Sequence, residues 1–323
     1  MATSLGRRFL TTDRGVIERY GDPFQLPLEP DCHVIQFDEA LTLAQLGQAA
    51  RLVADRPDVQ LYVYGRVWRD LSFLRYFPTL QRLHIALYEL DNIAGLFHLA
   101  GNLRELTFDE TRKKFSLRFL EVVPRLRMLF LVRHRTDIRC IQDLAELEEL
   151  GLTGITLPDL TLLLPLVRLR QLQLLLGGTT NLARLTQLPA LDELCLMRIT
   201  QLCDLDVLAD LTGLKKLHLQ WMRNVTSLPS LHRHDRLEDI TLDMMKGLTD
   251  LSPIAAAPAL RRLAVGDMRH LTPDNFRCFI GHPALRELLV ETGKLSLDAN
   301  IIEVLPGIAR PWSQPGQAQA SQH

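Results

Sequence analysis

An apolar pattern, Leu-x-x-Leu-x-Leu, recurs along this chain at intervals of 21 to 25 residues and strongly constrains its fold. The first, fourth and sixth positions are apolar in all ten copies, in a chain with 47% hydrophobic residues. The first positions are Leu80, Leu103, Leu126, Leu147, Leu169, Leu191, Leu214, Leu237, Leu260 and Leu285. A degenerate copy that begins at Asp58 precedes them. Such self-similarity indicates stacked copies of one structural unit.

The segment from Leu182 to Leu196 shows what one copy can fold into. Its leucines first recur every three residues, which suits a tight helical turn, and then after two, which is the side-chain period of a strand. Pro189 stands between the two parts, where a residue with fixed φ and no N–H suits a corner. So short a segment cannot bury its own leucines and requires copies on either side.

This pattern and period resemble the leucine-rich repeat family, most closely its SDS22-like and bacterial internalin-like branch. The resemblance covers roughly residues 58–292. It implies an α/β fold: a right-handed, horseshoe-shaped solenoid with a parallel β-sheet on the concave face and short helical or 3-10 turns on the convex face.

One position departs from the family. The ninth residue of the pattern is usually Asn or Cys, which bonds to backbone inside the coil. Here the ninth positions hold Tyr88, Thr111, His134, Ile155, Gly177, Ile199, Met222, Met245, Met268 and Gly293. Each turn must therefore satisfy its backbone groups in another way.

The domain organisation follows from the limits of the repeat. Residues 1–57 are predicted to form an N-terminal arm and cap, 58–292 a solenoid of about 11 repeats, 293–310 a C-terminal cap and 311–323 a disordered tail. A short strand is predicted from His33 to Phe37, and apolar spacing predicts helices from Ala40 to Ala54 and from Leu295 to Ile308. These elements would cover the leucines of the terminal coils.

Charge and cysteine content limit the partners and the compartment. With 37 basic and 38 acidic residues, the net charge of −1 argues against nucleic acid or an anionic membrane as the main partner. The five cysteines are scattered, and no apolar signal segment is evident near the N-terminus. We therefore expect a reduced, cytoplasmic protein that is a monomer.

Motifs for catalysis or cofactor binding are missing. The sequence contains neither an HExxH zinc motif nor a GxSxG nucleophile elbow. His232, His234 and Asp235 could suggest a metal site, but a solvated turn is the favoured interpretation of this segment. Cys195 and Cys203 lack CxxC spacing. We expect no catalytic residue, no cofactor and no metal.

Function must then come from the surface of the repeats, because alternate strand residues point away from the buried leucines. Stacking would align them in columns, with two clusters of aromatic, Met and Arg residues, the types enriched at interface hot spots. The residues expected to bind a partner are a first cluster of Tyr62, Tyr64, His84 and Phe130, a second cluster of Met197, Arg198, His218, Trp221, Asp243 and Met244, and in addition Arg133. For any one of them, packing into a corner is an equally good interpretation.

A run of basic residues, Arg112 to Lys114 and Arg133 to Arg135, suggests either an edge that steers an acidic partner or a solvated rim. The predicted function is a non-catalytic scaffold that binds a protein on the concave face. The alternatives are a bacterial effector or toxin-immunity protein, a regulatory subunit of an enzyme, and a structural spacer.

Overall fold

A computed structural model describes residues 33–37, 41–66, 68–305 and 307–308. The predicted arm before residue 31 and the predicted tail at 311–323 lie outside these residues. The described chain forms two compact units. Unit 1 comprises the described residues up to Ile155 together with Thr161–Leu172, and unit 2 comprises Thr156–Leu160 and the described residues from Gln173 onward.

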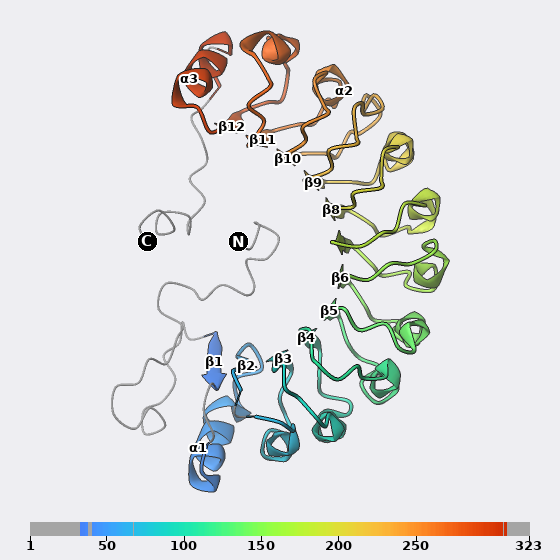
Figure 1. Cartoon of the computed structure of the whole chain (residues 1–323), viewed down its shortest axis with the longest axis vertical. Helices are drawn as coiled ribbons and strands as arrows, with labels where there is room; N and C mark the ends of the chain where they lie inside the picture. The colour runs from blue at the N-terminus through green and yellow to red at the C-terminus, as the bar shows by residue number, and fades with distance from the viewer. Residues whose placement is uncertain (1–32, 38–40, 67, 306, 309–323) are drawn as a thin grey trace. The chain divides into compact units, whose positions relative to one another are not determined.

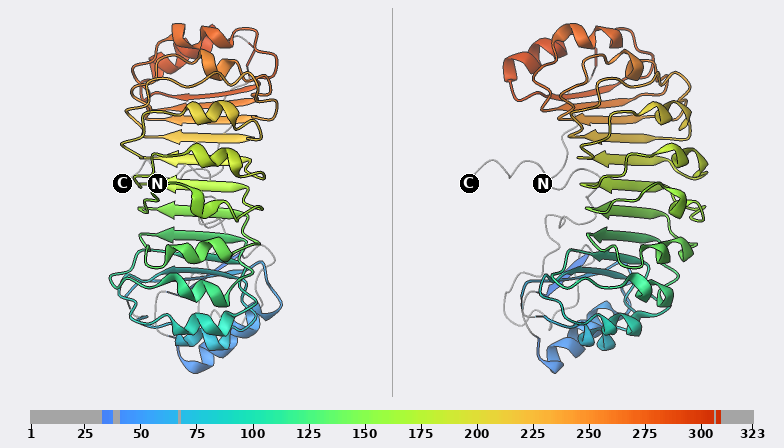
Figure 2. Two further views of the ribbon diagram at one scale, coloured as in Figure 1. Left: turned by 90° about the vertical axis from the view of Figure 1, so that its right-hand side faces the viewer. Right: turned by 45° about the vertical axis from the view of Figure 1, so that its right-hand side comes forward.

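The strands pair in chain order in a parallel sheet, β1 to β12, and in Figure 2 the arrows within each unit point the same way. The strands are β1 (Val34–Phe37), β2 (Gln60–Tyr64), β3 (Arg82–Ala86), β4 (Glu105–Phe108), β5 (Met128–Val132), β6 (Glu149–Thr153), β7 (Gln171–Leu175), β8 (Glu193–Met197), β9 (Lys216–Gln220), β10 (Asp239–Asp243), β11 (Arg262–Gly266) and β12 (Glu287–Glu291). The register places equivalent repeat positions side by side, as in the pairing of His218 with Thr241.

Short helices return the chain on the other side of most coils, as Figure 1 shows, and the coil between β9 and β10 returns through turns without a helix. They are η2 (Ser72–Tyr76), η3 (Ala94–Leu99), η4 (Leu117–Val122), η5 (Ile138–Asp143), η6 (Thr161–Leu163), η7 (Ala183–Gln187), η8 (Asp206–Asp210), α2 (Ser252–Ala255) and η9 (Pro273–Phe279). The fold class predicted from the repeat, a leucine-rich repeat solenoid of strands and 3-10 turns, is confirmed.

Longer helices, α1 (Leu43–Ala54) and α3 (Leu295–Val304), lie at the two ends of the repeats. Helix α1 begins after Thr42, whose side chain and that of Gln45 form a reciprocal capping box. It therefore starts later than the predicted Ala40. Helix α3 ends four residues before the predicted Ile308, and it packs on β12 and η9.

The core consists of the repeat leucines and their equivalents. All thirty positions from the ten copies are buried, with exposed fractions of at most 7%. Removal of this apolar area from water is the main stabilising contribution of each coil. His234 is a correction to the sequence interpretation, because it is fully buried at a position of the apolar run. His232 and Asp235 on either side are exposed, as expected for a solvated turn.

The turns after the strands satisfy backbone hydrogen-bonding groups without the Asn that the family usually has at the ninth position. The eighth residue of the pattern has a left-handed conformation in Arg133, Gly154, Leu176, Arg198, Trp221, Met244 and Asp267. Its N–H donates to a carbonyl of the next strand, as from Trp221 N to Asp243 O at 2.8 Å. The strand ladder is thereby extended by one bond, which needs no side chain at the ninth position, at Arg133, Leu176, Arg198, Trp221, Met244 and Asp267.

Candidate partner-binding face

We use the term open face for the side of the sheet on which the third, fifth and seventh residues of each pattern lie, away from the buried leucines. In unit 1 this face carries an aromatic row. The Tyr62 ring stacks on Tyr64 with centroids 4.9 Å apart and on His84 at 4.3 Å. His84 Nε2 lies 3.0 Å from Asp109 Oδ2, which makes the row end in a carboxylate. Burial raises the pKa of the Tyr62 hydroxyl.

Phe130, predicted to belong to the same cluster, lies on β5 and has a different support. A Cβ on Gly151 of β6 would come within 2.1 Å of Phe130 Cδ1, so the ring lies directly over this glycine. The absence of a side chain at Gly151 thus determines where Phe130 packs. The structure brings Tyr62, Tyr64 and His84 together, and Phe130 lies two strands further along the sheet than His84.

In unit 2 the second cluster is centred on a stacked pair. The Arg198 guanidinium carbon lies 4.4 Å from the centroid of the Trp221 ring, within the range of a cation–π interaction. Both residues have positive φ, and Trp221 remains 43% exposed. Met244 occupies the equivalent left-handed position in the next coil and is half-buried.

The remaining residues of this cluster form a polar pair on the open face. Gln220 Nε2 donates to Asp243 Oδ2, and the two residues are register partners on β9 and β10. Burial raises the pKa of the Asp243 carboxyl, with Gln220 partly opposing the rise. Gln220 was not among the predicted residues, although its place in the seventh-position column beside Asp243 is visible in the sequence. Met197 lies half-buried at the end of β8.

The fifth-position column is less accessible than the alternation predicted. His84 and His218 are buried, and Cys195 is only 1% exposed. Each fifth-position side chain lies between the fifth-position side chains of the two adjoining strands, which are about 4.8 Å away. These neighbours shield it from solvent on both sides. In unit 2 the fifth-position residues Thr241, Ala264 and Leu289 are half-buried, and the exposed residues of the second cluster, Arg198 and Trp221, lie in the turns after the strands.

Cys195 and His218 are register partners, and such a pair invites comparison with a thiol nucleophile and its base. Burial raises the pKa of the Cys195 thiol to about 12 and lowers the pKa of the His218 imidazole to about 4. The thiol therefore stays protonated at neutral pH. An activated cysteine needs the opposite shift, toward the thiolate.

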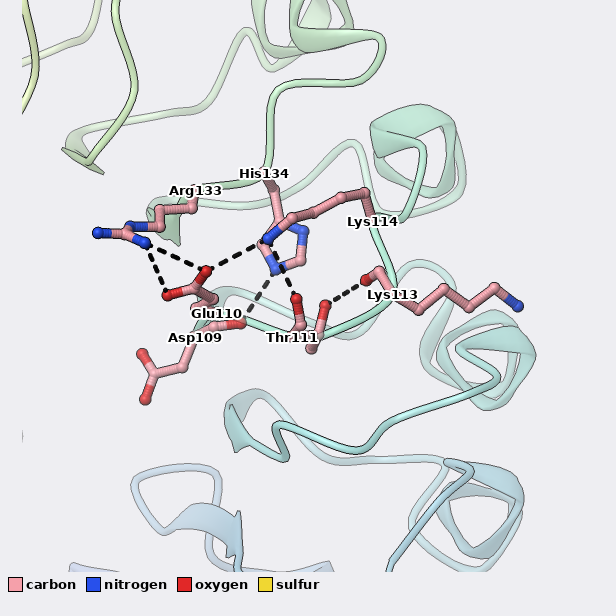
Figure 3. A network of polar contacts seen from close by, with 7 residues as sticks. All are labelled: Asp109, Glu110, Thr111, Lys113, Lys114, Arg133 and His134. Carbon is pink, nitrogen blue, oxygen red and sulfur yellow. Dashed lines mark hydrogen bonds and ion pairs between the residues drawn. The ribbon is translucent and has the colours of Figure 1, made fainter.

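Arg133 lies in a network of turn residues in unit 1 (Figure 3). Its guanidinium is 3.4 Å from the Glu110 carboxylate, and Lys114 Nζ approaches the same carboxylate at 3.3 Å. His134 is buried, stacks on Phe108 at 4.1 Å and is hydrogen-bonded through Nε2 to Asp109 O at 3.0 Å. The basic run expected at this edge is thus largely neutralised by its own coil and the one before.

Ion pairs between neighbouring strands line the third-position column, which sequence reasoning did not consider. Arg82 pairs with Glu105 at 3.1 Å in unit 1, and Lys216 pairs with Glu193 at 2.6 Å in unit 2. Arg262 makes a bidentate contact with Asp239. The sequence alone could have predicted these ion pairs, because the repeat fixes the third positions and neighbouring repeats carry opposite charges there.

Among the described residues, no group of three or more His, Cys, Asp or Glu side chains is arranged to hold a metal ion. None of the helices in this part of the chain has the length and apolar character needed to cross a membrane.

Comparison by sequence finds no matching family model and no matching curated protein. Comparison of structures identifies leucine-rich repeat proteins of bacteria. An internalin (inlF) from Listeria monocytogenes is similar with a TM-score of 0.58 and 16% identity, over 87% of this chain and 80% of the other. A leucine-rich repeat protein from Leptospira interrogans gives a TM-score of 0.58 and 17% identity, over 87% and 72%. The fold is the leucine-rich repeat fold, as the resemblance implied.

Proposed function

We propose that this chain is a non-catalytic scaffold that binds a protein partner on the open face and the adjoining turns. The observation that carries the proposal is Trp221. A bulky non-glycine residue in the left-handed region costs about 1–2 kcal/mol, and this one exposes much of its indole to water. The left-handed backbone lets the Trp221 N–H donate to Asp243 O, but that hydrogen bond does not require an indole side chain, and the exposed part of the ring adds nothing to the core.

The equivalent position in unit 1 shows that glycine suits this turn, because Gly154 adopts φ +65 there. In unit 2 the same position holds Arg198, Trp221 and Met244, residue types that anchor protein interfaces. Backbone strain combined with an exposed aromatic side chain is typical of a functional site. The aromatic row Tyr62, Tyr64 and His84 supplies a second contact region, on unit 1.

The non-catalytic part of the proposal is supported by the protonated Cys195 thiol and the neutral His218. We retain the predicted monomer and the predicted cytoplasmic location. Cys140 and Cys195 are buried free thiols, a state that suits a reducing compartment.

Trp221→Gly tests the function. Relief of the left-handed strain should offset part of what is lost with the Arg198 contact and the buried part of the ring, so the free energy of unfolding should fall by no more than about 2 kcal/mol. Affinity for a partner first purified with the wild-type chain should fall at least about tenfold, as for a central aromatic contact. His218 is unsuitable for this purpose, because substitution of a buried residue would also disturb folding.

Phe97→Ala is the matched control, since Phe97 is an exposed aromatic residue on η3, away from the open face. It should leave the affinity unchanged. Unaltered binding by Trp221→Gly, or equal losses in the two variants, would refute the role of Trp221.

A further inference from the structure

The turns of unit 2 carry a column of basic residues outside the predicted binding site. The tenth position of the pattern, two residues after the left-handed residue, holds Arg223, Lys246, Arg269 and Lys294 in four successive coils. All four are exposed. We call this column the basic edge.

Register places these residues next to one another. Strands β9, β10, β11 and β12 pair without a slip, through Gln220, Asp243, Gly266 and Glu291 at their ends. The turn residues that follow are therefore displaced by one coil each, about 4.8 Å where the strands pair. The Arg269 guanidinium extends over the next turn, since a Cβ on Gly293 would lie 2.8 Å from its Nη2.

Within the described residues, no ion pair or side-chain hydrogen bond engages the charged ends of the basic edge. Unit 1 differs: Arg112 at the same position pairs with Glu89 at 3.1 Å, and the neighbouring Lys113 Nζ donates to Asp91 O at 2.8 Å. The charges of the basic edge are thus solvated and available to a ligand of opposite sign.

The surroundings favour a protein over a nucleic acid. Asp267 and Glu291 lie in the adjoining seventh and eighth positions, where they would repel a continuous phosphate backbone. The carboxylates of an acidic peptide stand on flexible side chains that can turn away from Asp267 and Glu291, whereas phosphates are fixed in the backbone of a nucleic acid. The net charge of −1 gives the whole chain no general attraction for polyanions.

We propose that the basic edge is a second interaction surface, which binds an acidic segment of a protein. Its residues lie two positions beyond the left-handed turn residues that carry the proposed function, and the inference does not depend on that function. Binding is electrostatic and weakens as salt is added, because the contacts lie at the surface.

The probe is a peptide of ten glutamates with a central photo-crosslinking residue, measured by fluorescence anisotropy at low and moderate salt. The variant Arg223→Glu, Lys246→Glu, Arg269→Glu should lower its affinity at least about tenfold, since three attractions become repulsions. Cross-links to the wild type should map to the turns after β9, β10 and β11. The control Arg125→Glu, Arg139→Glu, Arg236→Glu alters the net charge equally at exposed sites elsewhere and should bind like the wild type.

Circular dichroism establishes whether the reversed variant is folded, and Arg223→Gln, Lys246→Gln, Arg269→Gln replaces it if it is not. The proposal is overturned if the edge variants bind as well as the wild type, or if the control loses as much affinity. It is equally overturned if cross-links map to the open face, or if a ten-nucleotide single-stranded RNA binds more tightly than the peptide.

Discussion

The turns after the strands are built differently in the two units. In two coils of unit 1 the ninth position holds a buried polar residue, Thr111 or His134, which bonds to the backbone atom Lys113 O or Asp109 O, and a third coil has the apolar Ile155 there. In unit 2 the same position holds Met222, Met245 and Met268, all fully buried. Hydrogen bonds hold the turns that contain Thr111 and His134, whereas apolar packing holds the turns that contain the three methionines.

The charges on these turns differ in the same way. Glu110 approaches both Arg133 and Lys114 in unit 1, whereas the described part of unit 2 provides no ion-pair partner for Arg223, Lys246 or Arg269. A turn anchored by a buried methionine does not need its exposed side chains to form ion pairs or hydrogen bonds that stabilise it. Apolar anchoring therefore leaves the exposed side chains of a turn free to bind a ligand, whereas in the polar turns of unit 1 many of these side chains pair within the fold.

The largest expected effect concerns His134. His134→Ala removes a buried ring from Phe108 and leaves Asp109 O without its side-chain partner, so the free energy of unfolding should fall by about 3–5 kcal/mol. His134→Met, which introduces the solution used in unit 2, should recover the packing and cost only about 1–2 kcal/mol. Urea denaturation measures both. Equal losses in the two variants would show that the hydrogen bond, and not the packing, holds the turn.

Low pH should reduce the stability of unit 2 more than that of unit 1. Burial lowers the pKa of His218 from 6.5 to about 4, so its contribution to stability is complete above pH 6.5 and declines as pH falls toward 4. The loss is of the order of 3 kcal/mol. Burial also lowers the pKa of His234 in unit 2, and of His134 in unit 1. The Asp243 carboxyl opposes part of the loss, because its raised pKa favours protonation in the folded state.

Hydrogen exchange at pH 7 and pH 4.5 measures this difference. The amides of β9 and β10 should lose more protection than those of β4 and β5. His218→Gln should remove much of the acid response in unit 2 while preserving it in unit 1. If protection falls equally in both units, or if His218→Gln leaves the response unchanged, burial of His218 does not control stability in acid.

The fold was predictable because one physical requirement recurs. Each Leu-x-x-Leu-x-Leu segment is too short to bury its own side chains, so only stacking satisfies all copies at once, and all thirty predicted positions are buried. His234 was misjudged because histidine is ambivalent: the sequence shows a polar residue in an apolar run but not whether the coil closes over it. The end of α3 at Val304 likewise depends on local contacts rather than on apolar spacing.

The candidate site was predictable by column but not by exposure. Alternation places His218 and Trp221 near the same surface, yet one is buried between neighbouring strands and the other is exposed in a turn. The left-handed conformation of Trp221 has no signal in its residue type, because such a backbone normally favours glycine. The pairing of Glu110 with Arg133 depends on side-chain reach between coils, which repeat spacing alone does not determine.

Removal of the ion pairs in the turns of unit 1 should change peptide affinity by only a few-fold. Glu89→Gln with Glu110→Gln removes the partners of Arg112, Arg133 and Lys114, and exposed pairs of this kind contribute under about 1 kcal/mol each. Stability should therefore change little. In a background where the basic edge is reversed, the affinity for the ten-glutamate peptide should nevertheless rise a few-fold, because unit 1 would then present unpaired charges of its own. Glu121→Gln with Glu146→Gln makes the same change in net charge away from these turns and should not raise it. If only Glu89→Gln with Glu110→Gln raises the affinity, ion pairing within unit 1 is what prevents its basic turn residues from binding the peptide. If neither pair of substitutions raises the affinity, peptide binding also requires the geometry of the methionine-anchored turns.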